Sequence, residues 1–265
     1  MSDINDRRST EPVLRVGHEP DGVVCLTLNR PAQRNALSET LLQTFKSALT
    51  ELATDPAVRV LILAGAGPAF CAGHDLKELR ALADEAAARA LFDLCGEVML
   101  AVRRFPHPVI AQVHGVATAA GCQLVASCDL AVACDHARFA TPGVNIGLFC
   151  STPAVALTRN VAYKHAMEML LTGEAIDAAT ARRIGLVNRV VPTAELELST
   201  RELARQIASR PPAVVSLGKA AVQGQLGLDE AAAYAETSAV MARNLLMAEA
   251  VEGIDAFLAK RPPRW

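Results

Sequence analysis

Two stretches of small residues have the composition of a site for a negatively charged oxygen. The first spans residues 65–74 (GAGPAFCAGH) and the second spans residues 114–121 (HGVATAAG). Each follows a buried-strand pattern and leads into a helical pattern, so backbone N–H groups at the helix start lack a helical acceptor. Those donors and the positive end of the helix dipole favour an anionic oxygen. Residues this small also let a ligand approach the main chain closely.

The two stretches can serve one site if their strands are neighbours. Loops that follow adjacent parallel strands leave a sheet at the same edge. The amides of His74 and Ala120 would then converge on one oxygen, which is the geometry of an oxyanion hole. The alternative is that the small residues only permit tight strand-to-helix connections, and the residues alone leave both open.

Composition excludes several function classes. The chain has 265 residues, of which 51% are hydrophobic, and 26 Lys and Arg against 28 Asp and Glu give a net charge of -2. This balance predicts neither nucleic-acid nor anionic-membrane binding. No apolar run reaches the ~18 residues of a membrane span, and the polar start predicts no signal peptide. Seven cysteines without a Cys-x-x-Cys pair predict a reducing, cytoplasmic location and no metal site.

The elements that position the two stretches follow from hydrophobic patterns. Strands are predicted at residues 13–16, 23–28, 58–64 and 109–113, and a helix capped by Ser38 runs to about residue 54. Asp75 is predicted to cap the helix that follows the first stretch. Helical patterns dominate the last third of the chain. We therefore expect an α/β core with a parallel sheet over residues 12–200 and a helical subdomain over residues 201–265.

Four ordered motifs carry a family resemblance that extends from about residue 12 to the end. They are NRP with NAL at residues 29–37, FCAGHDLK at 70–77, HG to GCQL with CD at 114–129, and FATP with Gly147 at 139–147; IDAFLAKR at 254–261 adds to them. Together they resemble the crotonase (enoyl-CoA hydratase/isomerase) superfamily closely. The resemblance implies a spiral of ββα units with a C-terminal helical trimerisation subdomain, and a homotrimer or a dimer of trimers.

The resemblance also implies a ligand and roles for residues. A coenzyme A thioester, with no permanently bound cofactor, would place its carbonyl between the amides of His74 and Ala120, where an enolate forms. Lys77 would lie near the CoA phosphates unless it is simply a solvated helix lysine. Phe257 and Lys260 would reach CoA from a neighbouring subunit, although Phe257 can also be a core aromatic. The remaining implied CoA-binding positions are Arg34, Ala36, Ala72, Asp75, Leu76 and Gly121.

The sequence departs from the family pattern at the acid–base positions. Two glutamates activate water in the hydratases, and the corresponding residues here are Gln123 and Gly143. The isomerase carboxylate corresponds to Ser151. An amide cannot exchange a proton near neutral pH, and a general acid or base contributes about 10²–10⁴-fold. We therefore expect weak hydration, and a gain when carboxylates are restored at positions 123 and 143.

Replacements for these carboxylates are few, and three functions stay open. Glu97 and Asp93 are candidates from a helix between the two stretches, but either can belong to a solvated face. Asp129 and His114 are expected to be structural. The chain is then an acyl-CoA enzyme of fatty-acid metabolism, or a non-catalytic acyl-CoA-binding or regulatory protein. A thioester hydrolase using Ser151 or Cys150 is the third possibility.

Overall fold

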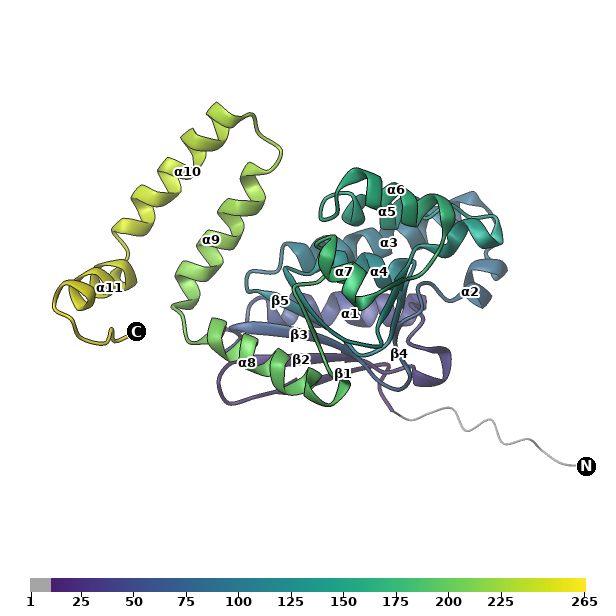
Figure 1. Ribbon diagram of the computed structural model, residues 1–265, viewed down its shortest axis with the longest axis horizontal. Coiled ribbons are helices and arrows are strands. Elements are labelled where there is room, and N and C mark those ends of the chain that lie inside the picture. The colour runs from purple at the N-terminus through teal and green to yellow at the C-terminus, as the bar shows by residue number, and fades with distance from the viewer. Residues whose placement is uncertain (1–10) are drawn as a thin grey trace, which may run out of the picture.

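Two sheets of different size form the core of residues 11–265, which are the residues that the computed structural model describes. The larger sheet has the strand order β1-β2-β3-β5-β7-β10, and the smaller has the order β4-β6-β8-β9 (Figure 1). The strands are β1 (Leu14–His18), β2 (Val23–Leu28), β3 (Val60–Gly65), β4 (Ala69–Cys71), β5 (Val109–Val113), β6 (Val116–Thr118), β7 (Leu130–Cys134), β8 (Arg138–Ala140), β9 (Ile176–Asp177) and β10 (Arg189–Val191).

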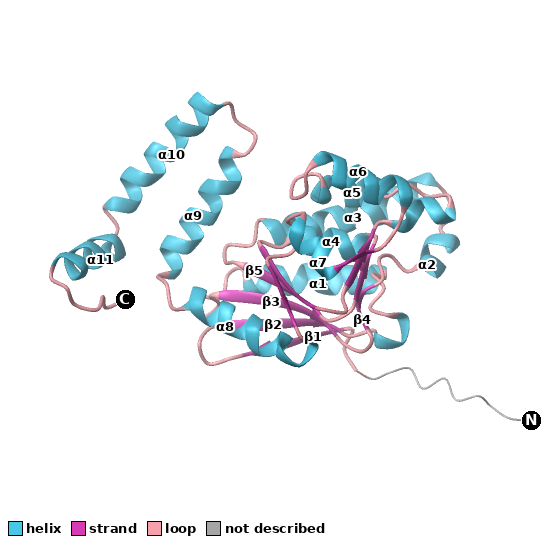
Figure 2. Cartoon of the chain, viewed as in Figure 1, coloured by secondary structure: helices cyan, strands magenta, loops and turns pink. Residues whose placement is uncertain are grey.

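Helices follow the strands and then continue alone to the end of the chain, as the cyan ribbon of Figure 2 shows. Short 3-10 turns lie at Pro31–Gln33, Pro142–Ile146 and Thr193–Glu195. The helices are α1 (Glu39–Leu52), α2 (Leu76–Ala81), α3 (Glu85–Arg103), α4 (Ala120–Ser127), α5 (Ser151–Leu157), α6 (Tyr163–Thr172), α7 (Ala178–Arg183), α8 (Leu196–Ala208), α9 (Pro212–Gln225), α10 (Glu230–Leu245) and α11 (Ala248–Leu258).

The strands that precede the two small-residue stretches are parallel neighbours. β3 pairs with β5, with Leu61 opposite Val109, so the predicted adjacency is confirmed. Their β-branched and leucine-rich sequences suit strands that are buried on both faces. Local signals also hold, because Ser38 caps α1 through the amide of Leu41 and Asp75 caps α2 through the amide of Lys77. Both stretches therefore leave the larger sheet at one edge.

Each stretch contains a short strand that the sequence patterns do not predict. β4 and β6 have three residues each and pair in parallel, with Ala69 opposite Val116. This pairing starts the smaller sheet and aligns the two stretches by direct backbone hydrogen bonds. The resulting repeat is a long strand, a short strand and a helix, β3-β4-α2 and then β5-β6-α4, as expected for ββα units.

The last helices leave the core as an arm. α8 packs against β3, β5 and β7, and the predicted boundary at residues 200/201 lies within it. The chain turns away at Pro211 and Pro212, and α9 to α11 extend beside the core in Figure 1. An ion pair of 2.6 Å between Lys219 in the middle of α9 and Asp129 ties this helix to the core. Within residues 11–265 no helix has the length and apolar character needed to cross a membrane.

Helix α4 lies directly on β4 at a glycine. A Cβ at Gly121 would overlap the carbonyl oxygen of Cys71 and lie 2.8 Å from its carbonyl carbon. The obstructing atoms belong to the backbone of a buried strand, so they cannot turn aside as a flexible side chain would. Glycine at this position therefore sets how closely the start of α4 approaches the first stretch.

We expect Gly121→Ala to lower the free energy of unfolding by about 3 kcal/mol, because the added methyl group overpacks a rigid contact. Gly96→Ala is the matched control. It lies inside α3 with no atom within 4 Å of the new Cβ, so its helix propensity should raise stability by about 0.5–1 kcal/mol. Urea unfolding followed by circular dichroism measures both. Equal effects of the two substitutions would contradict the close-approach argument.

Candidate active site

The bridge between His74 and Leu37 leaves the His74 N–H without a backbone acceptor among the described residues. Leu37 forms a parallel bridge to His74. In that bridge the Leu37 N–H donates to the Gly73 oxygen at 2.8 Å, and the Asp75 N–H donates to the Leu37 oxygen at 3.2 Å. The N–H of His74 itself donates to no backbone carbonyl among residues 11–265. It is one of the two donors that the sequence singles out.

The amide of Ala120 is left free by the start of α4. The N–H of Ala119 donates to the Ala140 oxygen at 2.9 Å, and Gln123 returns to the Ala119 oxygen at 3.0 Å. Between them the Ala120 N–H has no backbone acceptor in the described part of the chain. Ala119 has φ 50° and ψ -118°, a conformation that costs an L-residue about 1–3 kcal/mol and that clusters at functional sites.

The two donor loops touch across Gly73. This residue has φ +89°, and a Cβ built on it would lie 2.9 Å from the Ala119 Cβ and 3.4 Å from the Ala120 nitrogen. His74 and Ala120 also line one cavity of about 560 Å³. The structure therefore brings both predicted donors to the same space. Apolar and small residues form most of its wall, including Ala72, Leu76, Leu79, Phe92, Ala119, Pro142, Gly143, Ile146, Leu148, Phe149 and Pro153.

The imidazole of His74 is a feature of this cavity that sequence reasoning missed. Its ring meets Phe92 edge-on, with centroids 5.2 Å apart. Burial lowers the pKa of His74 to about 4, so the ring is neutral at pH 7. Its Nε2 is buried and has no hydrogen-bond partner among the described residues. The only sequence signal for this ring was the presence of a histidine in the FCAGHDLK stretch. The fold is needed to show that the ring is enclosed.

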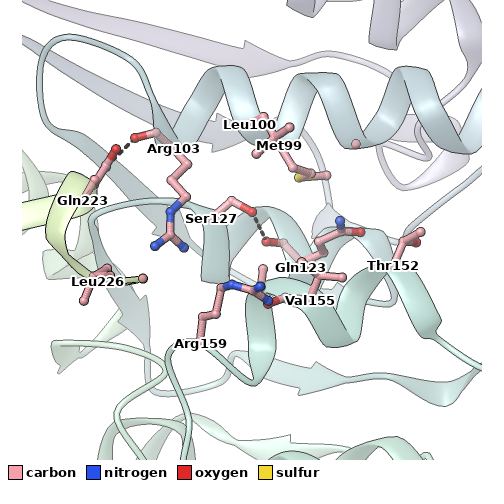
Figure 3. Close-up of a pocket in the computed structure, with 13 residues that line it drawn as sticks. Met99, Leu100, Arg103, Gln123, Ser127, Thr152, Val155, Arg159, Gln223 and Leu226 are labelled. Atoms are coloured by element: carbon pink, nitrogen blue, oxygen red, sulfur yellow. Dashed lines mark hydrogen bonds between the residues drawn. The ribbon is translucent and has the colours of Figure 1, made fainter. Parts of the chain in front are cut away.

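Gln123 and Gly143, which the sequence resemblance singles out as acid–base positions, lie on different walls. Gly143 lines the cavity of His74 and Ala120. Gln123 is 4% exposed and lines a second cavity of about 630 Å³, and Thr152 borders both cavities (Figure 3). The Gln123 Oε1 is buried and has no hydrogen-bond partner among residues 11–265. Gln123 and Gly143 therefore line two different cavities, which share Thr152.

The expectation that a carboxylate can be restored at both positions is wrong for Gly143. A Cβ there would lie 2.5 Å from the Leu148 oxygen and 2.9 Å from the Cys150 sulfur. A glutamate would therefore have to displace the loop at residues 143–150. Gln123 already carries a side chain of glutamate's size, so only that position accepts the change without rebuilding backbone.

The predicted CoA-binding residues of the first half have different settings, and only two of them line the cavity. Ala72 and Leu76 line it. Asp75 pairs with Arg30 at 3.0 Å, and this pair lowers the pKa of the carboxyl although its burial opposes the shift. The Arg34 carbonyl accepts the Ala72 amide at 3.0 Å. Of the predicted residues that do not line the cavity, Arg34 and Lys77 are exposed, and Ala36 and Gly121 are buried.

The predicted C-terminal CoA contacts lie on the arm. Phe257 belongs to α11, is 82% exposed, and is followed by Lys260 with φ 53°. The alternative of a core aromatic is therefore wrong for Phe257 within one chain. Figure 1 places α11 at the end of the arm, away from α2 and α4 of the same chain. Any contact of these residues with a ligand in this cavity would require a second copy.

The candidate replacement carboxylates do not face the cavity. Glu97 pairs with Lys46 at 2.7 Å, and Asp93 pairs with Arg89 at 3.4 Å. The two carboxylate side chains are 56% and 66% exposed, and neither lines the cavity. Both therefore belong to a solvated face in this chain.

The residues expected to be structural have structural contacts. The Asp129 carboxylate accepts the Val109 amide at 2.8 Å, in addition to its pair with Lys219. The His114 Nε2 lies 2.8 Å from the Gly67 oxygen. These bonds fix the ends of β5, from which the second stretch starts.

The two candidate nucleophiles are not activated. Burial raises the pKa of the Cys150 thiol, against a backbone hydrogen bond to Gly143 that lowers it. The Ser151 hydroxyl has a single contact of 3.5 Å, to the Phe149 oxygen. All seven cysteines are free. In residues 11–265 no group of three His, Cys, Asp or Glu side chains is arranged to hold a metal.

A family model for enoyl-CoA hydratase/isomerase matches residues 18–265. The chain belongs to the enoyl-CoA hydratase/isomerase family. It is 49% identical over 259 residues to human enoyl-CoA hydratase domain-containing protein 3, mitochondrial, covering 98% of this chain and 86% of that protein. It is 34% identical over 243 residues to 2,3-dehydroadipyl-CoA hydratase of Escherichia coli, covering 91% and 94% of the two chains.

Solved structures of the family confirm the predicted fold. A crystal structure of an enoyl-CoA hydratase from Mycobacterium smegmatis superposes with a TM-score of 0.95 at 52% identity, over 96% of this chain and 99% of that one. The crystal structure of human enoyl-CoA hydratase domain-containing protein 3 gives a TM-score of 0.90 at 48% identity, over 96% and 100%. The α/β crotonase class with a helical C-terminal region is thus established for this chain.

The buried imidazole predicts a pH-dependent stability. The pKa of His74 rises from about 4 in the folded chain to 6.5 in the unfolded chain. Between these values the unfolded chain binds a proton that the folded chain excludes, so stability falls as the pH decreases from 6.5 to 4. We expect the loss between pH 7 and pH 4 to be about 3 kcal/mol larger in the wild type than in His74→Gln. Urea unfolding at the two pH values measures it, and equal losses would show that the ring is not enclosed.

Proposed function

We propose that the chain binds acyl-CoA thioesters and holds their carbonyl oxygen between the amides of His74 and Ala120. The observation that carries this proposal is the pair of unpartnered N–H groups on one cavity, from loops in contact across Gly73. Two such donors stabilise the negative oxygen of an enolate, and one of them is worth about 3–4 kcal/mol where this was measured in other enzymes. The chain would then be an enzyme of fatty-acid metabolism that acts through thioester enolates.

We propose that hydration of a double bond by this chain is weak. Gln123 and Gly143 stand where the hydratases carry glutamates, and neither can take and return a proton. The Ser151 position of the isomerases has no carboxylate either, and Glu97 and Asp93 pair elsewhere. The second candidate function is therefore a non-catalytic acyl-CoA-binding or regulatory protein, favoured by the absence of a carboxylate from the lining of either cavity. A thioester hydrolase ranks third, because Cys150 and Ser151 lack an activating partner.

For the CoA moiety we propose the mouth of the cavity. Backbone and side chains of Arg34, Ala36, Ala72, Asp75, Leu76, Lys77 and Gly121 would surround it, with Lys77 near the phosphates. Phe257 and Lys260 would come from a neighbouring subunit, because the arm carries them away from the cavity of their own chain. CoA enters this scheme as part of the substrate and not as a resident cofactor.

We propose a homotrimer, or a dimer of trimers, assembled through the arm. Neither α9 nor α10 buries a residue within the chain. Large apolar side chains stand exposed along the arm, with Leu246 and Phe257 each 82% exposed. A helical arm with so much apolar surface is stabilised when copies cover it.

For the compartment we propose the cytoplasm, because seven free thiols suit a reducing environment. The human and rodent relatives are named mitochondrial, which is a statement about those proteins.

A panel of purified acyl-CoAs separates the first two functions. Turnover of a member supports the enzyme, and tight binding without turnover supports the binding protein. For hydration we expect little activity on crotonyl-CoA from the wild type and a gain of roughly 10²-fold in Gln123→Glu, which restores one general acid–base group. Gln206→Glu, an exposed substitution on α8 outside both cavities, should leave activity unchanged. Robust hydration by the wild type would contradict the carboxylate argument, and failure to bind any acyl-CoA would contradict the proposed function.

The proposed assembly predicts the mass in solution. Sedimentation velocity should give a species of three or six chains. We expect Leu246→Lys combined with Phe257→Lys to shift it towards the monomer, because charges replace apolar side chains that other copies would cover. A wild-type chain that sediments as a monomer at micromolar concentration would rule out the trimer.

A further inference from the structure

A second cavity lies between four helices and shares the lining residue Thr152 with the candidate active site. It has a volume of about 630 Å³ and meets the first cavity at Thr152, which lines both. Residues of α3, α4, α5 and the end of α9 surround it (Figure 3). A ligand whose reacting group lies at His74 and Ala120 would reach the second cavity by passing Thr152.

The polar part of this second cavity is positively charged. Arg103 and Arg159 line it, and none of its lining residues is acidic. Figure 3 shows both guanidinium groups extending into the space beside Ser127. Among residues 11–265 the Arg103 guanidinium has no ion pair or hydrogen bond, although the Arg103 carbonyl oxygen accepts from Gln223. One N–H of Arg159 donates to the Val155 oxygen at 2.7 Å. Most of their ten N–H donors are thus available.

Nearby acids do not neutralise these arginines. Asp129 is close enough to Arg103 to be affected by its charge, but its carboxylate is engaged by Lys219 at 2.6 Å and by the Val109 amide at 2.8 Å. A planar guanidinium group can donate two parallel hydrogen bonds to one carboxylate, a geometry that a lysine ammonium group does not offer. The cavity therefore offers a binding place for a carboxylate.

The rest of the wall is apolar. Met99, Leu100, Val155 and Leu226 provide most of the hydrophobic surface. A purely hydrocarbon ligand would suit this wall, but it would displace water from the two guanidinium groups without replacing the hydrogen bonds of that water. The combination fits an aliphatic chain that ends in an anionic group.

We infer that the second cavity binds the far end of an acyl group that terminates in a carboxylate, which Arg103 and Arg159 hold. The ligand class is the CoA half-thioester of an aliphatic dicarboxylic acid. This inference rests on the proposed acyl-CoA function and specifies its substrate. The thioester lies at the two amides, the methylene chain passes Thr152 and Gln123, and the free carboxylate ends at the arginine pair.

Calorimetric titration with length-matched pairs of CoA esters tests the inference. The pairs are hexanoyl-CoA with adipoyl-CoA and octanoyl-CoA with suberoyl-CoA, so that the members of a pair differ only in the terminal carboxylate. We expect the dicarboxylic member of at least one pair to bind about tenfold more tightly, as a charge-assisted hydrogen bond supplies. Arg103→Ala and Arg159→Ala should each reduce this preference, because each removes donors to the terminal carboxylate of the dicarboxylic member. Arg104→Ala is the matched control, because this neighbouring arginine is exposed and lines neither cavity.

The outcomes distinguish the inference from the function on which it rests. Equal affinities within both pairs, with clear binding of the esters, would overturn the inference and leave the acyl-CoA function intact. A preference that survives both arginine substitutions would also overturn it, because another group would then hold the carboxylate. Failure of the wild type to bind any of the four esters would overturn the proposed function and the inference together.

Discussion

The close contact between the start of α4 and the backbone of β4 is the constraint on which the site depends. Gly121 lies against the Cys71 carbonyl, and Gly73 lies against Ala119 and the Ala120 nitrogen. Side chains at either glycine would separate the two loops by the thickness of a methyl group or more. The parallel pairing of β4 with β6 holds the same loops in register. The left-handed φ of Ala119 is tolerated because packing on both sides leaves the chain no relaxed alternative.

The parts of the fold that were predictable from the sequence are those encoded by local signals. β3 and β5 are continuous buried strands, so their composition alone indicates them, and Ser38 and Asp75 cap helices through amides two or three residues away. β4 and β6 were not predictable in this way. The three-residue segments AFC and VAT are too short to show a periodicity, and these strands form because β4 pairs with β6 and β6 also pairs with β8.

The same distinction applies to the site. Its backbone donors were predictable because strand, small loop and helix are contiguous in sequence, twice over. The imidazole of His74 and the second cavity were not, because their properties arise from packing between distant segments. Phe92 comes from α3 to meet the His74 ring. Arg103, Gln123 and Gln223 belong to three different helices and Arg159 to the turn after α5, and no spacing in the sequence brings them together.

A binding site built from backbone amides can persist while its side-chain chemistry changes. No side-chain substitution removes the N–H of residue 74 or residue 120 unless it introduces proline. Position 143 is different, because the Leu148 carbonyl and the Cys150 sulfur occupy the place of a side chain there. The loop at residues 143–150 is therefore folded around a glycine, and its backbone leaves no space for a carboxylate side chain there. At position 123 a glutamate would differ from the glutamine by one atom within a side chain of the same shape. The two positions are thus unequal, because a carboxylate at 143 requires a different backbone and a carboxylate at 123 does not.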